Sequence, residues 1–293
     1  MTNVIEEKNE NYPIKIKECL SDYKPIYYRG NLSLLDKPSI AIVGSRKASS
    51  YGKSCARALA KCAVEYGAVV VSGLALGIDS EAHSACLENG GETIAVLANG
   101  VDVFYPKRNQ AMQKRIEETG LLLSEYEDGT RAQRYTFPVR NRIISAISDA
   151  IVIVEAGSRS GSLITAECAQ EQGKEVYSIP GNITSPGSLG TNKLIRDGAV
   201  PLINFDELFE DLGLSKSNKK IDQIFLSKTE SRVLEVVKGG SELSIEQIRH
   251  IIDIDLAEIN AIITILEMKG LIFCEMGKVS PALWVWWLSL IHI

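Results

Sequence analysis

The sequence predicts an α/β fold: an extended Rossmann-like, doubly wound, mostly parallel sheet with a small C-terminal winged-helix domain. From residue 39 to about residue 212, short β-branched apolar runs alternate with helical segments, which is the pattern of a parallel sheet wrapped by helices. Runs that are apolar throughout, such as 150–154, are typical of strands buried on both faces. The alternation therefore assigns the elements in chain order.

Strands are expected at 40–43, 69–72, 93–97, 121–125, 150–155, 176–179 and 200–203. Helices are expected at 51–66, 78–89, 109–119, 139–148, 163–172 and 191–197, and each is long enough for a crossover connection. Loops rich in glycine or serine enter three of these helices, at 44–46, 73–77 and 157–162. Because loops after parallel strands share the carboxyl edge of a sheet, where ligands bind, we expect a binding site at that edge.

The Rossmann-like domain is predicted over 38–213, after a segment, 1–37, that is too short and too polar for a domain of its own. The polar, aperiodic segment 214–222 is interpreted as a linker. Over 223–282, amphipathic helices at 229–237, 244–252 and 255–269 precede a short hairpin at 271–279, which is the order of a winged helix. The tail 283–293 holds all three tryptophans and is either a partner-binding peptide or a translated artefact, so it receives no function.

The composition indicates a globular protein: 293 residues, 45% hydrophobic and 24% charged, with a mean hydropathy of +0.02. The first residues are polar and acidic, which predicts no secretory signal, and no apolar run is long enough to span a membrane. Six scattered cysteines without CxxC spacing, and three histidines in all, predict a reduced, cytoplasmic protein with no metal site and no other cofactor.

A cationic stretch without any acidic residue lies between residues 129 and 148, although the net charge of the chain is -5. It carries Arg131, Arg134, Arg140 and Arg142 beside Tyr135 and Phe137. Guanidinium groups match phosphate oxygens and aromatic rings stack on bases, so this mixture predicts a site for single-stranded nucleic acid. The alternative is that these arginines are solvated or paired with distant carboxylates, which would suffice for one pair of arginines but explains four less well.

A second acid-free stretch, 39–64, carries Arg46, Lys47, Lys53, Arg57 and Lys61. Arg46 follows Gly44 and Ser45 between a strand and a helix, so backbone N–H groups and the positive helix end are expected to face an anion there. A solvated helix face explains the last three basic residues well. The loop 157–162 leads into another helix and is expected to add a further helix N-terminus to the anion site, unless its serines only cap that helix. Several helix starts near two basic stretches suit a polymer better than a mononucleotide.

Known nucleotide motifs do not fit the chain. GSRKAS replaces the GxGxxG fingerprint after the first strand, which disfavours NAD. The triplet Gly52, Lys53 and Ser54 resembles the end of a P-loop but lies inside a predicted helix, which disfavours ATP binding of the P-loop kind. Asp79 is expected to cap its helix and His83 to pack or hydrogen-bond locally, so no catalytic residue is assigned and the protein is not predicted to be an enzyme.

Four motifs in order carry a family resemblance: GSR at 44–46, SGLALGID at 72–79, FPVRNRIIS at 137–145 and GSLITA at 161–166. Over about 12–213 the chain resembles the DNA-processing protein A family, DprA/Smf. The resemblance implies a Rossmann-like domain that binds single-stranded DNA, forms a homodimer and loads the RecA recombinase during natural transformation, without established catalytic turnover. It also implies single-strand-binding protein as a further partner. The helical N-terminal domain of many members is reduced here to 1–37.

The same resemblance assigns the nucleic-acid-binding residues. Gly44, Ser45 and Arg46, with Lys47 beside them, are expected to bind phosphates, and Ser72 and Gly73 to line the pocket. Arg140, Asn141 and Arg142 are expected to contact the DNA backbone, with Arg134 as a weaker member of the set, and Phe137 is expected to face a base. Gly161, Ser162 and Thr165 would complete the site at a helix start.

Two other functions stay open at this stage. An enzyme, a nucleoside-monophosphate phosphoribohydrolase of the lysine-decarboxylase-like Rossmann family, would carry a PGGxGT loop followed by a glutamate; 157–167 is loosely similar but lacks the double glycine. A transcription factor would read duplex DNA with the winged helix. Its presumed recognition helix, 255–269, carries Asp255, Glu258 and Glu267 against Lys269 alone, so we expect a protein-contact or regulatory role instead.

Overall fold

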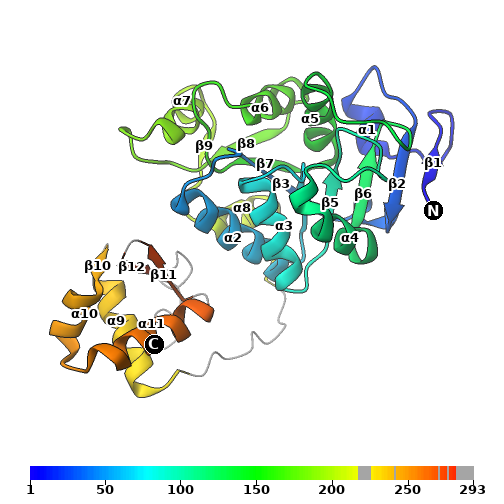
Figure 1. The fold of residues 1–293 in the computed structure, drawn as a ribbon. Helices are drawn as coiled ribbons and strands as arrows, with labels where there is room; N and C mark the ends of the chain where they lie inside the picture. The colour runs from blue at the N-terminus through cyan, green and yellow to red at the C-terminus, as the bar shows by residue number, and fades with distance from the viewer. Residues whose placement is uncertain (217–225, 241, 270, 276, 282–293) are drawn as a thin grey trace. The chain divides into compact units, whose positions relative to one another are not determined.

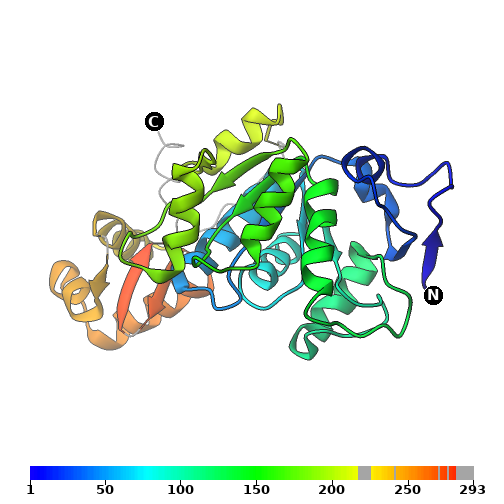
Figure 2. The same ribbon diagram turned by 90° about the horizontal axis from the view of Figure 1, so that it is seen from above.

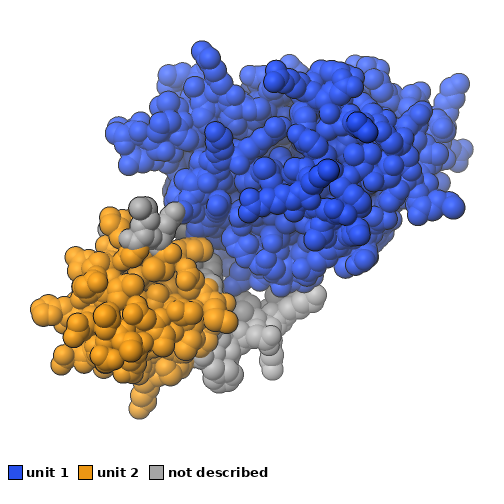
Figure 3. Space-filling view, viewed as in Figure 1, with its two compact units in different colours: residues 1–217 blue, residues 218–293 orange. Residues whose placement is uncertain are grey.

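The structure is a computed structural model, and it describes residues 1–216, 226–240, 242–269, 271–275 and 277–281. The tail 283–293 and most of the predicted linker 214–222 lie outside the described residues. The chain divides into two compact units, 1–217 and 218–293 (Figure 3). None of the helices in the described ranges is long and apolar enough to cross a membrane.

The first unit is built on one nine-stranded sheet in the order β1-β2-β6-β5-β4-β3-β7-β8-β9. Its strands are β1 (Asn3–Ile5), β2 (Ile26–Gly30), β3 (Ser39–Val43), β4 (Val69–Ser72), β5 (Thr93–Val96), β6 (Leu121–Ser124), β7 (Ala150–Ile153), β8 (Glu175–Ser178) and β9 (Val200–Pro201). From β3 to β9 neighbouring strands pair in parallel, whereas β2 pairs antiparallel with β6 and with β1. The sheet is therefore mostly parallel, as predicted.

Helices cover both faces of this sheet (Figures 1 and 2). One face carries α1 (Ile14–Cys19), α5 (Thr136–Ile147), α6 (Ser162–Glu171) and α7 (Leu189–Arg196), and the other carries α2 (Ser50–Glu65), α3 (Ile78–Glu88), α4 (Gln110–Thr119) and α8 (Phe205–Asp211). Short 3-10 helices lie at η1 (Leu32–Asp36), η2 (Lys107–Asn109) and η3 (Pro186–Ser188). Every residue of β3, β4, β5, β6 and β7 is buried, which is why these strands read as continuous apolar runs.

The structure differs from the prediction mainly at the N-terminus, at α5 and at α8, a helix that was not predicted. The segment 1–37, expected as a short separate piece, supplies β1, α1 and β2 and so extends the sheet. Its strands mix polar and apolar residues, so no apolar run marks them in the sequence. Helix α5 begins at Thr136 rather than at 139, because Pro138 is tolerated in the first turn of a helix. Phe137 is thus a helical residue.

The second unit contains α9 (Lys228–Gly239), α10 (Ile245–Ile252) and α11 (Leu256–Met268) and a small antiparallel sheet. The strands β10 (Leu243–Ser244), β11 (Ile272–Glu275) and β12 (Lys278–Pro281) lie in the order β10-β12-β11. Capping boxes, from Ser227 to Glu230 and from Ser244 to Gln247, start α9 and α10. The helices and the hairpin occur in the predicted order, and the winged-helix assignment itself stays a prediction.

Candidate nucleic-acid interface

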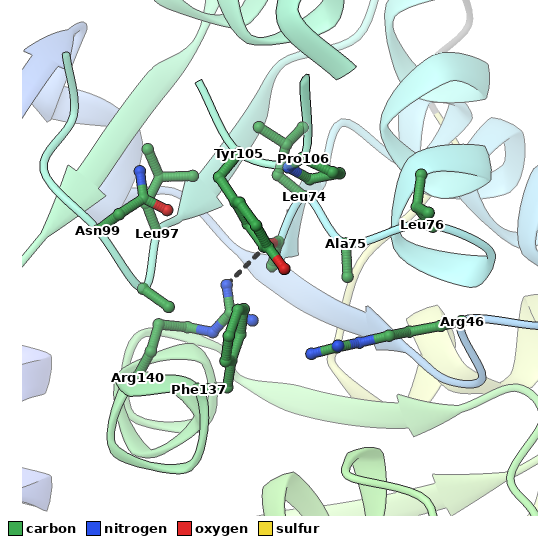
Figure 4. A pocket seen from close by; sticks show the side chains of 12 residues that line it. Arg46, Leu74, Ala75, Leu76, Leu97, Asn99, Tyr105, Pro106, Phe137 and Arg140 are labelled. Atoms are coloured by element: carbon green, nitrogen blue, oxygen red, sulfur yellow. Dashed lines mark hydrogen bonds between the residues drawn. The ribbon is translucent and has the colours of Figure 1, made fainter. Parts of the chain in front are cut away.

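A pocket lies at the carboxyl edge of the sheet, where the loops after β3, β4 and β5 meet the first turns of α5 (Figure 4). It is lined by Arg46, Gly73, Leu74, Ala75, Leu76, Leu97, Ala98, Asn99, Tyr105, Pro106, Phe137 and Arg140. Its volume of about 60 Å³ is small beside the roughly 300–1,000 Å³ of sites that enclose a small-molecule ligand. The pocket can therefore hold a part of a larger molecule but not a whole nucleotide.

One wall of the pocket is a stack of aromatic and guanidinium groups. The Arg46 guanidinium lies over the Phe137 ring, with its carbon 4.7 Å from the ring centroid. The Tyr105 and Phe137 rings are tilted by 50° with centroids 5.8 Å apart. Tyr105 is 45% exposed, so one edge of the stack faces solvent. This arrangement offers both a flat surface for a base and a positive charge beside it.

Arg140 supplies a charge at the floor of the pocket although it is only 4% exposed. Its Nη1 donates to the carbonyl oxygen of Gly73 at 2.7 Å and to that of Val96, and its Nε donates to Asn141 Oδ1 at 3.2 Å. Within the described part of the chain, the other terminal nitrogen, Nη2, has no recorded hydrogen bond or ion pair. Figure 4 places this guanidinium beside Phe137 and facing Arg46. The floor of the pocket thus has an unused donor.

Burial sets the protonation of the groups under the pocket. Burial lowers the pKa of Arg140 to about 10, so the guanidinium still carries its charge at neutral pH. Burial raises the pKa of Asp79, and the charge of Arg140 opposes that shift. The Asp79 carboxylate accepts from Gly73 N at 3.1 Å and from Ala75 N at 3.4 Å, so it fixes the loop after β4 instead of capping α3, whose N-cap is Gly77.

His83 packs locally, as the sequence predicted, and is not at the surface of the pocket. Its Nδ1 lies 2.7 Å from Thr93 Oγ1, and that hydroxyl donates to the carbonyl of Val70. Thr93 must therefore accept from Nδ1–H, which leaves Nε2 unprotonated, and this buried atom has no hydrogen-bond partner among the described residues. Burial, reinforced by the charge of Arg140, lowers the pKa of His83 to about 3.

The depressed pKa of His83 predicts acid sensitivity. The unfolded chain binds a proton at this histidine below about pH 6.5, whereas the folded protein does not until about pH 3. Stability is therefore present above pH 6.5 and is lost as the pH falls, by about 1.4 kcal/mol per pH unit for one proton. In urea titrations between about pH 6 and pH 4, His83→Asn should reduce this slope by that amount, and His250→Asn, at an exposed histidine, is the matched control. Equal slopes in His83→Asn and the unmodified protein would contradict the assignment.

The first basic loop differs from the prediction at the start of α2. That helix begins at Ser50, beyond the loop of Gly44, Ser45 and Arg46, and its N-cap is Ser49. The Glu155 carboxylate accepts from Ser49 N at 3.0 Å and from Ser49 Oγ at 2.5 Å. The expected bound anion at this helix end is therefore replaced by the protein's own carboxylate, which the helix dipole stabilises.

The remaining atoms of that loop are mostly structural. Ser45 N donates to the Glu155 carbonyl at 2.7 Å, and Ser45 Oγ accepts from Lys47 N. A side chain at Gly44 would lie 2.7 Å from Ile78, so glycine lets the loop pass close to α3. Arg46 and Lys47 are exposed and leave this loop with two cations for a ligand.

Four residues that were expected at the site hold the surrounding fold together and do not line the pocket. Ser72 is buried and donates its hydroxyl to the Ile42 carbonyl, so it holds the sheet together and does not line the pocket. Asn141 donates to the Gly161 carbonyl at 3.1 Å and thereby ties α5 to the start of α6. Ser162 and Thr165 are buried, and the Ser162 hydroxyl is 2.8 Å from that of Ser160. None of these three side chains contributes to the pocket wall.

Arg142 corrects the prediction most clearly. Its Nη2 lies 2.6 Å from both carboxylate oxygens of Glu125, and its Nη1 donates to the Asp22 carbonyl at 2.8 Å. The Glu125 side chain is 2% exposed and that of Arg142 is 19% exposed. Arg142 was expected to contact DNA but is instead neutralised by a buried carboxylate and ties α5 to β6 and the N-terminal segment. Arg134 is exposed in the loop before α5.

The family model for DNA recombination-mediator protein A matches residues 3–213. The chain belongs to this family. The resemblance recognised from the four sequence motifs is therefore confirmed.

Relatives and solved structures agree with this membership. DNA processing protein DprA of Streptococcus pneumoniae is 45% identical over 188 residues, which are 64% of this chain and 66% of that protein. The Bacillus subtilis protein of the same name is 38% identical over 211 residues, which are 72% of this chain and 71% of that protein. The chain thus spans about two thirds of the length of these relatives.

Two solved structures support the fold. The X-ray structure of DprA from Streptococcus pneumoniae is 41% identical with a TM-score of 0.68, covering 71% of this chain and 74% of that one. A structure on the single-stranded DNA binding mode of DNA processing protein A from Helicobacter pylori is 34% identical with a TM-score of 0.66, covering 72% of this chain and 95% of that one. The α/β prediction with a mostly parallel sheet is confirmed.

Within this family member, sequence reasoning missed the loop after β5. Asn99, Tyr105 and Pro106 line the pocket, and all lie between β5 and η2. The loop contains no glycine-rich or serine-rich run before a helix, but it follows a parallel strand and therefore reaches the same edge of the sheet. Its position in the strand order was the signal that could have found it. The described residues also contain no group of three or more His, Cys, Asp or Glu side chains that could hold a metal ion.

Proposed function

We propose that this protein binds single-stranded DNA at the pocket and acts as a DNA recombination mediator. The observation that carries the proposal is the nearly buried Arg140, whose unused Nη2 lies at the pocket floor beside the stack of Arg46, Phe137 and Tyr105. A phosphate or base oxygen can accept from Nη2 while a base packs against the stack. Family membership and the single-stranded DNA binding of the Helicobacter pylori relative support the same conclusion.

The shape of the pocket favours a single strand over a duplex. In a duplex the faces of the bases are stacked on one another, so they are not available to an aromatic side chain. A single strand can turn one base toward Phe137 while its phosphates stay in solvent near Arg46, Lys47 and Arg134. The small volume agrees with this, because only part of one nucleotide has to enter.

The finer parts of the proposal follow the family. We infer that the protein loads the RecA recombinase onto the bound strand during natural transformation, works in the cytoplasm as a homodimer, and meets single-strand-binding protein on the same DNA. The second unit would contact a protein rather than duplex DNA, because the exposed residues of α11 include Glu258 and Glu267. We infer no catalytic turnover; release of free base from AMP-type nucleotides would instead support the phosphoribohydrolase alternative.

Replacing Arg46 by alanine tests the proposed function. The change should weaken binding of a fluorescent oligo-dT by about tenfold, which corresponds to about 1.4 kcal/mol, because it removes both a cation and one layer of the stack. The free energy of unfolding should change by less than about 0.5 kcal/mol, since Arg46 is exposed. Lys8→Ala, at an exposed lysine of the N-terminal segment, is the matched control. Unchanged affinity in Arg46→Ala would exclude this pocket as the DNA site.

A further inference from the structure

Four exposed cations follow the pocket residues Tyr105 and Pro106 in a stretch of chain that contains no acidic residue. One of them, Arg115, donates to the Leu87 carbonyl at 2.8 Å, and the other three have no hydrogen-bond partner among the described residues. Lys107 and Arg108 belong to η2, and Lys114 lies in α4. Residues 107–116 include no Asp or Glu. In the described ranges none of the three has a recorded ion pair, whereas Arg57, on the same side of the sheet, is bridged to both Glu81 and Glu88. We refer to Lys107, Arg108 and Lys114 as the η2 cations.

The η2 cations are held in a fixed position relative to the pocket. Tyr105 and Pro106, the two residues before Lys107, both line the pocket. The next anchor is Asn109, whose buried Nδ2 donates to the carbonyl of Leu74 at 2.9 Å, and Leu74 is itself a pocket residue. Gln113, also buried, donates to the carbonyls of Val101 and Val103. The basic segment is therefore fastened from both ends to the walls of the site.

Hydrogen bonds join this segment to the loop that carries the predicted arginines. Gly100 N donates to the Thr130 carbonyl at 2.9 Å, and Gly129 N donates to the Asp102 carboxylate at 2.8 Å. The loop before α5, with exposed Arg131 and Arg134, is thus fixed to the loop that leads into η2. Asp102 is occupied by that contact, and Glu117, the next acidic residue along the chain, pairs with Arg29. Neither is recorded as neutralising an η2 cation.

We propose that the η2 cations form a second contact surface for the phosphates of the DNA strand, outside the pocket. The inference rests on the proposed function. A strand whose base sits against Phe137 must continue past the Tyr105 side of the pocket or away from it, and on the Tyr105 side it meets Lys107 and Arg108 first. Lys114 lies about one helical turn into α4, with its Nζ 5.7 Å from the centroid of the Phe104 ring, and extends the same surface. Each neutralised phosphate releases counterions, so the surface contributes affinity that depends on salt.

Oligonucleotide length separates the η2 cations from the pocket. We would measure binding of oligo-dT of about 4 and about 20 nucleotides, lengths that bracket the usual site sizes, across a range of salt concentrations. Lys107→Ala/Arg108→Ala should leave the short oligonucleotide unaffected. For the long one it should weaken binding several-fold and reduce the slope of log K against log salt by about 1.4, at about 0.7 for each lost phosphate. Arg46→Ala should weaken both lengths.

Lys8→Ala/Arg232→Ala is the matched control, because it removes one exposed lysine and one exposed arginine that are far from this segment in sequence. If Lys107→Ala/Arg108→Ala binds the long oligonucleotide as well as the wild type does, while Arg46→Ala is impaired, the inference is overturned and the proposed function is left intact. Equal losses for both lengths, or an equal loss in the control, would also overturn it, since either result means that the two cations do not form a separate surface. Failure of the unmodified protein to bind either length would overturn the proposed function itself.

Discussion

Replacing Arg142 by leucine should lower the free energy of unfolding by about 3 kcal/mol or more, while the folded protein keeps its affinity for oligo-dT. The change leaves the Glu125 carboxylate buried without its partner and removes the donor to the Asp22 carbonyl. Breaking a buried ion pair on one side costs about 3–5 kcal/mol because the remaining charge cannot be solvated. Urea unfolding measures the loss, and binding is measured at a temperature where the variant is folded.

The double variant Arg142→Leu/Glu125→Leu is the control for this effect. It removes both charges together, so most of the lost stability should return. Burial raises the pKa of Glu125 against the influence of Arg142, so the deficit of the single variant should shrink as the pH falls and the carboxyl takes up a proton. If Arg142→Leu instead kept its stability and lost oligo-dT binding, Arg142 would be a DNA contact after all.

Replacing Gly73 by alanine should have the largest effect on the pocket. The new Cβ would lie 2.5 Å from Arg140 Nη2 and 2.6 Å from its Cζ, so the guanidinium would have to move. Moving it breaks its hydrogen bonds to the Gly73 and Val96 carbonyls. We expect a loss of about 2 kcal/mol or more in the free energy of unfolding, from crowding and from unpaired buried groups. Binding of oligo-dT should fall by at least about tenfold, because the donor at the pocket floor is displaced.

Gly239→Ala makes the same chemical change where no atom lies within 4 Å of the added methyl group, and it should be neutral in both assays. Gly73→Ala with wild-type affinity would mean that Arg140 does not meet the DNA. A loss of stability without a loss of affinity would restrict Arg140 to a structural role.

The order of the elements could be predicted because strands that are buried on both faces consist almost entirely of apolar residues. Strands β3 to β7 are buried on both faces, so almost every position is apolar, and the predicted bounds differ from the observed ones by at most two residues at either end. β1 and β2 could not be found in this way, since they extend the sheet at its antiparallel edge and mix polar with apolar residues. Their place depends on pairing with β6, a contact distant in sequence.

The sequence by itself determined that cations and aromatic rings would gather at the carboxyl edge of a parallel sheet, since the strand order brings the loops to that edge. Only the tertiary structure decided which arginines are available to a ligand. Arg140 and Arg142 are two residues apart on α5, so their side chains point about 200° apart around the helix. One turns toward the loops after β4 and β5 and reaches the pocket, and the other turns toward Glu125 and is neutralised. The sequence shows which side chains are charged, but the fold determines which group each of them pairs with.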